Sequence, residues 1–388
     1  MTSQARLSEW VECVGENLTT LSRAQALGLA LWSFGIACTR SSGRQTVATF
    51  LAMLTHKRVD ALEQRLYEWC LDAKDKHGEQ RSEVKVESCF VPLLRWIMRI
   101  WSSEQVALTL DATSLGERFV VLCISVVYRG IGIPVAWCVL PAGEQHSWRC
   151  EWLRLLRLLR PAIPAGRTVI VLADRGLYAR WLYQRIVRLG WHPFLRINVG
   201  GKFRPKGKDW GSLTHLVSAL GTRWAGKGTA FVTPAAQLDC TLLACWQPGY
   251  KQPWFILTDL DPAQGDVAWY SLRAWCEQGF KCTKRGGWQW QQTQMQEANR
   301  AARLWLAFAL AMFWMVAIAS DLELAAQDLS QMYPELQPLL APRSRNRRSI
   351  RLFRLGWLWL LARLINQLTL PLPTKLVPEP WPAFSNSS

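Results

Sequence analysis

The last third of the chain carries four residues whose types and spacing suit phosphate and metal chemistry: Tyr270, Arg273, Glu277 and Lys284. At about 100° per residue, all four lie within about 60° of one another on a helix. A stripe with that period is normally the apolar face that a helix buries, yet this one holds a phenol, two cations and a carboxylate. We expect the helix to pack through its opposite, apolar side. It would then present to a cleft one metal-binding carboxylate flanked by phosphate-binding groups.

The elements that must position this stripe lie upstream of it. The runs VALTLDAT, RFVVLCISVVYRG and IPVAWCVLP are rich in β-branched residues and predict three consecutive antiparallel strands. Further along, RTVIVLAD and HPFLRI predict a fourth and a fifth strand. Helices are expected from Ser147 to about Arg160 and from Tyr178 to Leu189. This order predicts an α/β sheet that is covered by helices on both faces.

Two aspartates lie at the ends of apolar runs in this predicted sheet. Asp111 belongs to the first strand, and Asp174 follows the fourth. Because these strands are neighbours in a sheet of this order, we expect the two carboxylates to converge at one edge. An aspartate at a strand end is also a common turn former or helix N-cap. Together with Glu277, however, the pair makes a set of three oxygen ligands, which suits Mg²⁺ or Mn²⁺ and not zinc.

These residues carry a family resemblance. The sequence resembles a DDE-class insertion-sequence transposase, and Y-x2-R-x3-E-x6-K matches the Tyr-Arg-Glu-Lys signature of the insertion-sequence-four group at every interval. The resemblance covers roughly residues 100–320. It implies a ribonuclease-H-like mixed sheet with flanking helices, with a β-rich insertion before the third carboxylate. It also implies that Asp111, Asp174 and Glu277 are the catalytic triad.

The resemblance further implies a mechanism and a set of partners. Two Mg²⁺ or Mn²⁺ ions per active site would be held by the triad, with Asp111 bridging them, and would support an in-line displacement. Water would free a 3′-hydroxyl at the transposon end, and that hydroxyl would then attack target DNA. Tyr270, Arg273 and Lys284 would hold phosphates. The partner would be double-stranded DNA, both terminal repeats and target, bound by a homodimer in the bacterial cytoplasm at the nucleoid.

The predicted insertion supplies further candidates for DNA contact. The loop Gly201–Lys208 is basic, and we expect Lys202, Arg204 and Lys206 to bind DNA, although a solvated charged loop has the same composition. In the related family, an aromatic residue of the insertion stacks a flipped base. The candidates here are Trp210, Trp224, Trp246 and Trp254.

The sequence divides into five predicted regions. These are a helical DNA-binding domain (1–95), the first part of the ribonuclease-H-like core (100–198), the β-rich insertion (199–266), the core helices with the catalytic glutamate (267–320), and a C-terminal helical region with a disordered tail (321–388). In the first region Arg40, Arg44, Lys57 and Arg58 are available for phosphates, although a helical bundle that only packs is the alternative. The polar segment 72–85 is the expected linker. The arginine-rich segment 343–354 would bind DNA, dimerise or dock.

Composition agrees with a polyanionic partner. The chain has 46 Lys and Arg against 29 Asp and Glu, a net charge of +17 and a pI near 9.7, which favours nucleic acid or an anionic membrane surface. The 11 cysteines include no CxxC pair and indicate the reducing cytosol. The uncharged run Leu304–Ser320 is at the lower limit of a membrane span, and we expect a buried core helix with no membrane insertion.

Three classes of function therefore compete. The first is a metal-dependent transposase that cuts and joins DNA. The second is a DNA-binding protein of the same fold that has lost catalysis, or a stand-alone nuclease that cleaves without joining. The third is a membrane-associated protein, suggested only by the uncharged run.

Overall fold

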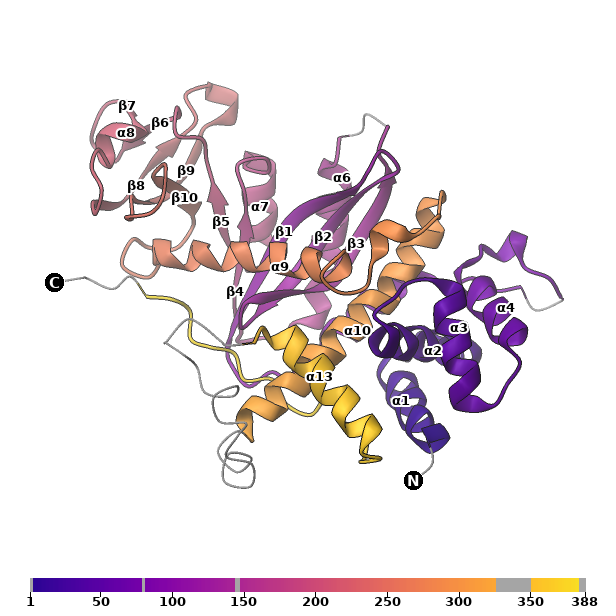
Figure 1. The fold of residues 1–388 in the computed structure, drawn as a ribbon. Coiled ribbons are helices and arrows are strands. Elements are labelled where there is room, and N and C mark those ends of the chain that lie inside the picture. Colours follow the sequence, from indigo (N-terminus) through magenta and orange to yellow (C-terminus); the bar gives the residue numbers. More distant parts are fainter. Residues whose placement is uncertain (1–2, 79–80, 144–146, 326–349, 384–388) are drawn as a thin grey trace.

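The computed structural model describes residues 3–78, 81–143, 147–325 and 350–383 (Figure 1). Its α-helices are α1 (Ser3–Asn17), α2 (Arg23–Thr39), α3 (Arg44–Thr55), α4 (Val59–Cys70), α5 (Phe90–Arg99), α6 (Arg149–Leu159), α7 (Arg180–Arg188), α8 (Leu213–Leu216), α9 (Ala274–Thr283), α10 (Ala298–Leu324) and α13 (Leu352–Ile365). Its strands are β1 (Gln105–Leu115), β2 (Phe119–Tyr128), β3 (Ile131–Pro141), β4 (Thr168–Ala173), β5 (His192–Arg196), β6 (Lys202–Pro205), β7 (Gly211–Ser212), β8 (Arg223–Ala230), β9 (Leu238–Cys245) and β10 (Trp254–Thr258). A 3-10 helix, η5 (Val267–Arg273), precedes α9.

The strands of the described residues form one mixed sheet in the order β3-β2-β1-β4-β5-β10-β9-β8-β6-β7. The first three strands are antiparallel, and a tight turn joins β2 to β3 through Arg129 and Gly130. Both turn residues have positive φ, 44° and 92°, as the commonest two-residue hairpin turns require. The expected three-stranded meander is therefore present.

The strands that carry the predicted aspartates are neighbours, as expected. β4 runs parallel to β1, and β5 runs parallel to β4. The chain returns from β3 to β4 through α6 and from β4 to β5 through α7, because parallel strands need a crossover connection. Figure 1 shows α9 crossing the sheet on the side opposite α6 and α7, so helices cover both faces of this part of the sheet.

The strands between residues 202 and 258 continue the same sheet. β10 pairs with β5, and β9, β8 and β6 follow outward in antiparallel pairs. This segment is β-rich, as the sequence predicts. The prediction that Lys202, Arg204 and Lys206 share a loop is partly wrong. Lys202 and Arg204 lie in β6, and of the three only Lys206 lies in the turn after it.

The N-terminal helices share their hydrophobic core with the rest of the chain. Trp10 of α1 stacks on Trp314 of α10 with ring centroids 4.1 Å apart, and one apolar cluster runs from Leu7 to Leu376. α2 begins at a capping box in which Ser22 and Gln25 bond each other's backbone amides. The helical region is therefore built onto α10.

The polar segment 72–85, expected to be a linker, is held against α10 at both of its ends. Residues 79–80 in its middle lie outside the described residues. Arg303 of α10, which is 4% exposed, donates to the carbonyls of Cys70 and Val84 and to the carboxylate of Asp72 at 2.8, 3.1 and 2.6 Å. These three oxygens give the buried guanidinium the hydrogen-bond acceptors that it needs. The segment is tied to α10 by this network.

The apolar run Leu304–Ser320 lies inside α10. This helix is long and apolar enough to cross a membrane, and 94% of its most hydrophobic window is buried inside the protein. It packs against α2, β3 and α13. A helix that is hydrophobic all round and enclosed by protein is a core helix.

At the C-terminus, α13 docks on α10, where Gly356 allows the two helices to approach closely. A Cβ at Gly356 would lie 1.9 Å from the carbonyl oxygen of Met315. Beyond α13, Trp381 packs on Trp269 at 4.7 Å, so the expectation of disorder is wrong for residues 378–383. The tail residues 384–388, and residues 343–349 of the arginine-rich segment, lie outside the described residues.

Candidate active site

Asp111 and Asp174 are brought together by the pairing of β1 with β4. Leu110 of β1 is opposite Ala173, the last residue of β4, and an aspartate follows each of them. Asp174 also serves as a turn former, since its Oδ1 accepts from the backbone amide of Gly176 at 2.8 Å. Its Oδ2 contacts Arg273 at 3.3 Å. The two aspartates therefore meet at this edge of the sheet, as the sequence predicts.

The predicted four-residue stripe is divided between two kinds of helix. Tyr270 and Arg273 lie in η5, Glu277 lies in α9, and Lys284 follows the last residue of α9. The segment is helical from Val267 to Thr283 without a break, but its first part is a 3-10 helix, and Lys284 lies one residue beyond its end. Tyr270 is buried in the core, with 4% of its surface exposed, and does not line the cleft.

Arg273 lies at the centre of the three carboxylates. Its Nη2 contacts Asp111 Oδ2 at 2.9 Å and Asp174 Oδ2 at 3.3 Å, and its Nη1 contacts Glu277 Oε1 at 2.8 Å. The side chains of Arg273 and Asp111 are 16% exposed, whereas those of Asp174 and Glu277 are 43% and 53% exposed. The structure thus collects all three predicted catalytic carboxylates around one cation.

The most enclosed of the three carboxylates is Asp111. Burial raises its pKa above the ordinary value, although Arg273, the Cys276 thiol and the Ala112 amide act in the opposite direction. The Cys276 thiol donates to Asp111 Oδ2 at 3.1 Å, and burial strongly raises the pKa of that thiol, which keeps it protonated. The sequence pattern alone did not predict this contact.

A close approach of α9 to β3 makes this contact possible. A Cβ on Gly279 would lie 2.3 Å from the carbonyl oxygen of Gly132, and a Cβ on Gly132 would lie 2.9 Å from Cys276 Cα. Only glycine fits at such distances. The two glycines therefore let α9 lie low enough on the sheet for Glu277 and Cys276 to reach the aspartates.

Tyr270, predicted to bind DNA, is a core residue in this structure. It is 4% exposed, packs edge to face on Trp254 at 5.3 Å and hydrogen-bonds the Arg196 side chain. Burial raises its pKa to about 12, while Arg273 and Arg196 lower it. The hydroxyl group, for which a phosphate contact is predicted, is engaged with Arg196, and the ring packs behind Arg273.

Lys284 is half-buried beside the end of β1. Its Nζ donates to Thr113 Oγ1 at 2.8 Å and to the carbonyl of Ser114 at 2.7 Å, and burial lowers its pKa. An ammonium group has three donors, so one remains for a phosphate oxygen. Lys284 therefore links the C-terminal end of α9 to β1, the strand that carries Asp111.

The basic residues of the β-rich segment lie farther along the sheet. Lys202, Arg204 and Lys206 are exposed, and Arg204 lies over the Trp210 ring at 5.2 Å. Arg204 and Lys206 line a groove of about 830 Å³ together with Lys208 and Lys227. This cationic groove fits the predicted phosphate contact, although Asp239 and Asp259 also line it.

The four tryptophan candidates for base stacking are all at least half-buried. Trp254 is 8% exposed and packs on Tyr270, so it is a wall residue. Sequence reasoning missed Tyr250, which is 42% exposed and packs edge to face on Trp254 at 4.6 Å. Its loop adjoins the site, because Gln252 accepts from Arg175 at 3.0 Å.

The N-terminal residues predicted to bind phosphates are only partly free to do so. Arg40 donates to the carbonyl of Gly286 at 3.1 Å and lies over Trp357, and Arg44 pairs with Glu63 at 3.0 Å. Arg58 pairs with Asp60 at the surface. Lys57 lines a groove of about 680 Å³ between α1, α2 and α4. Arginines inside protein contacts have fewer donors left for DNA.

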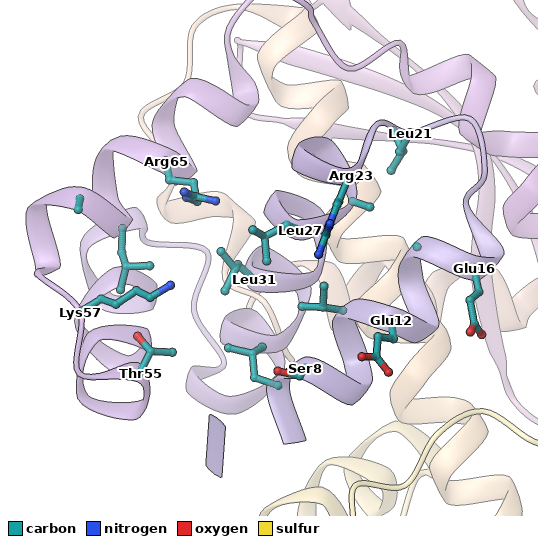
Figure 2. Close-up of a pocket in the computed structure, with 16 residues that line it drawn as sticks. Ser8, Glu12, Glu16, Leu21, Arg23, Leu27, Leu31, Thr55, Lys57 and Arg65 are labelled. Carbon is teal, nitrogen blue, oxygen red and sulfur yellow. The ribbon is translucent and has the colours of Figure 1, made fainter. Parts of the chain in front are cut away.

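Figure 2 shows how the charges of that groove are arranged. The apolar Leu27 and Leu31 lie between Lys57 on one side and Glu12 on the other. Carboxylates of α1 line one wall, so this groove carries both signs of charge. The candidate active site is instead the cluster of three carboxylates around Arg273.

The other acids near the site already have partners. Asp259 bonds His192 at 3.0 Å, and Asp261 pairs with Lys227 at 2.8 Å. Asp266 caps η5 by accepting from the amide of Ala268 at 2.8 Å. None of these three joins the carboxylates around Arg273. They remain poor rivals to Glu277 as a third metal ligand.

A second acidic group, Asp72, Asp75 and Glu297, has ligand atoms that lie close enough together to hold an ion. Each of these carboxylates, however, is paired with an arginine. Arg303 contacts Asp72 at 2.6 Å, and Arg300 contacts Asp75 at 3.4 Å and Glu297 at 2.8 Å. This group is therefore an ion-pair network that joins α10 to the segment that follows α4.

Comparison with known proteins identifies a family for the central region. Residues 116–314, more than half of the 388-residue chain, match the family described as the transposase DDE domain. The match includes Asp174 and Glu277 and begins shortly after Asp111. The structure is also similar to the cryo-EM structure of the piggyBac transposase synaptic complex with hairpin DNA, with 11% identity, a TM-score of 0.37, and 99% of this chain and 85% of that chain covered. No curated protein matches the chain.

Proposed function

We propose, from the premise that this chain belongs to the transposase DDE-domain family, that it cleaves DNA at transposon ends and transfers the freed 3′-hydroxyl to target DNA. The family implies a nuclease and transesterase enzyme. The observation that carries the proposal is the convergence of Asp111, Asp174 and Glu277 on one point of the sheet edge. The Tyr-Arg-Glu-Lys signature supports assignment to the insertion-sequence-four group.

The fold offers support of its own. Strand order β3-β2-β1-β4-β5, with only β2 antiparallel to its neighbours in that set, is the order expected of a ribonuclease-H-like core. We propose that residues 100–198 and 267–320 form this core and that 199–266 is the insertion. The helical region 1–95 and the C-terminal region 321–388 are proposed to contact DNA or a second protomer.

The three carboxylates fit a divalent cation. Their oxygens already surround a positive group in this structure, and oxygen ligands of this kind suit Mg²⁺ or Mn²⁺. Asp111, Asp174 and Glu277 would hold the metal, and we propose two ions per site. When bound, such ions lower the pKa of water and stabilise the leaving oxygen of a phosphodiester.

The chain's own residues would perform the remaining work. Cys276 and the Ala112 amide fix the orientation of Asp111 through hydrogen bonds of 3.1 and 2.9 Å. Lys284 would hold a phosphate oxygen beside the end of β1, and Arg273 would hold another through its planar fork. The partial enclosure of Asp111 strengthens each of these electrostatic contacts, because less water screens them.

The proposed partner is double-stranded DNA, both terminal repeats and target. The net charge of +17 and the groove lined by Arg204, Lys206, Lys208 and Lys227 support a phosphate backbone as ligand. A homodimer assembled on DNA, in the bacterial cytoplasm at the nucleoid, completes the proposal. The exposed Tyr250 is the aromatic we propose for stacking on a base near the cleavage point.

The proposal is tested with purified protein, Mg²⁺, a target plasmid and DNA that carries the flanking ends of the protein's own gene. Wild type should cleave the ends and join them to the plasmid, whereas Glu277→Gln should do neither. Glu297→Gln is the matched control, because it removes an exposed acid that pairs with Arg300, and it should retain both activities.

The alternatives give different results in the same assay. Cleavage without joining would favour a stand-alone nuclease. Specific binding without cleavage in wild type would favour a DNA-binding protein that has lost catalysis. Equal cleavage by wild type and Glu277→Gln would refute the assignment of the site.

A further inference from the structure

Arg273 takes the position that a divalent cation would need. Its two terminal nitrogens contact one oxygen from each carboxylate, namely Asp111 Oδ2, Asp174 Oδ2 and Glu277 Oε1. These are the oxygens that converge on the centre of the site. A guanidinium and a divalent ion cannot share them at full strength, because two cations at such separations repel each other.

The position of Arg273 is also well defined within the protein. The side chain is 16% exposed. Arg273 is the last residue of η5, and the residue before it, Leu272, is buried in the core. Burial lowers its pKa, but Asp111 and the neighbouring groups raise it more, so the guanidinium stays charged. Its Nε is buried and makes no hydrogen bond to any residue that the structure describes. The contacts of the guanidinium with the three carboxylates are therefore made by its two terminal nitrogens.

From this geometry we infer that Arg273 is a positioning residue that couples metal binding to DNA binding. Without metal, it holds the three carboxylates together as a set and neutralises part of their charge. When DNA arrives, a phosphate gives the guanidinium a new anionic partner, and the carboxylate oxygens become available to the divalent ion. The inference rests on the proposed metal-binding role of the three carboxylates.

The coupling must act in both directions. If DNA increases the affinity for metal by drawing Arg273 away, metal increases the affinity for DNA by the same factor. The protein would then bind metal weakly when it is free and more tightly when it is on DNA. Strand cleavage would in this way be confined to the assembled complex.

The first test is Mn²⁺ binding by calorimetry in the absence of DNA. Arg273→Gln should bind Mn²⁺ about tenfold more tightly than wild type, because the carboxylates no longer have a competing cation. Arg273→Lys, which keeps the charge without the fork, should fall between the two. Arg175→Gln is the matched control, since Arg175 follows Asp174 but contacts Gln252 instead of the carboxylates, and its affinity should equal that of wild type.

The second test repeats the titration in the presence of a DNA duplex of arbitrary sequence. The duplex should raise the Mn²⁺ affinity of wild type and Arg175→Gln about tenfold and should leave that of Arg273→Gln unchanged. Circular dichroism and thermal melting identify any variant that fails to fold, and Arg273→Lys then carries the comparison.

The outcomes separate this inference from the proposed function. Equal Mn²⁺ affinity in Arg273→Gln, Arg175→Gln and wild type, with loss of binding in Asp111→Asn, would overturn the coupling and leave the metal site standing. Unchanged Mn²⁺ binding in Asp111→Asn would overturn the metal site itself.

Discussion

At the scale of single residues, the site depends on how buried charges are satisfied. Asp111 is the carboxylate with least access to water among the three, and it relies on Arg273, the Cys276 thiol and a backbone amide. Removing one partner of a buried charge leaves the other partly unpaired, which is more costly than the loss of an average hydrogen bond. The arrangement explains why a thiol, usually a small apolar core group, lies beside a proposed metal ligand.

This contact leads to a prediction for Cys276. Cys276→Ala should lower the cleavage rate about fivefold, because Asp111 loses a donor worth about 1 kcal/mol. Cys276→Ser should restore most of the rate, since a hydroxyl can donate to the same oxygen. Single-turnover cleavage at saturating Mg²⁺ measures both. Equal rates in the alanine and serine variants would show that the thiol only fills space.

At the scale of elements, the packing of α9 on the sheet decides whether the third carboxylate reaches the first two. The helix approaches β3 closely only because Gly132 and Gly279 have no side chains. The sequence pattern predicted the strands and the neighbours β1 and β4 because alternation and strand order are local or topological properties. It could not predict that η5 is a 3-10 helix, because the same spacing fits both helix types until the buried partners of Tyr270 are known.

We therefore predict that Gly279→Ala destabilises the protein by about 1–3 kcal/mol and reduces cleavage. The new Cβ would lie 2.3 Å from the Gly132 carbonyl oxygen, which forces α9 away from the sheet. Gly15→Ala is the control, because the added Cβ at that position in α1 meets nothing within 4 Å. That change should leave cleavage intact and raise stability by up to about 1 kcal/mol. Urea unfolding measures both, and similar effects of the two substitutions would argue against a special close contact at α9.

At the scale of the whole molecule, α10 connects the helical N-terminal region with the sheet that bears the site. Trp314 and Arg303 reach from this helix to α1 and to the segment after α4. From sequence alone, the uncharged run 304–320 predicted a buried helix, and the structure confirms it. The polar composition of segment 72–85 predicted a linker, but the structure ties this segment to α10. Its partner Arg303 lies more than 200 positions away along the chain, so local composition could not reveal the contact.

The ion pair between Asp72 and Arg303 gives a prediction for the pH dependence of stability. Burial raises the pKa of Asp72. The hydrogen bond and the positive charge of Arg303 lower it by more, so the net shift of the pKa is downward. The stabilisation is therefore complete above the unfolded pKa of about 3.9 and is lost as pH falls through the lower folded value. Asp72→Asn should cost about 2 kcal/mol at pH 7, and the difference from wild type should shrink below about pH 4.

Denaturant unfolding at a series of pH values measures this difference. Lys227 and Asp261 form an exposed pair at 2.8 Å, and Asp261→Asn should change stability little at any pH because surface pairs contribute little. A gap between wild type and Asp72→Asn that stays constant down to pH 2 would contradict the assignment of the pair.

The central claim is that the carboxylates around Arg273 are ligands of a catalytic metal, and metal rescue of Asp174→Cys tests it most directly. With Mg²⁺ the variant should cleave transposon-end DNA at least about 100-fold more slowly than wild type, since a lost metal ligand removes several kcal/mol of stabilisation. With Mn²⁺, which accepts sulfur ligands more readily than Mg²⁺, the deficit should shrink about tenfold or more. Asp261→Cys should match wild type with both ions. Full activity of Asp174→Cys with Mg²⁺, or an equal deficit with both metals, would contradict the account.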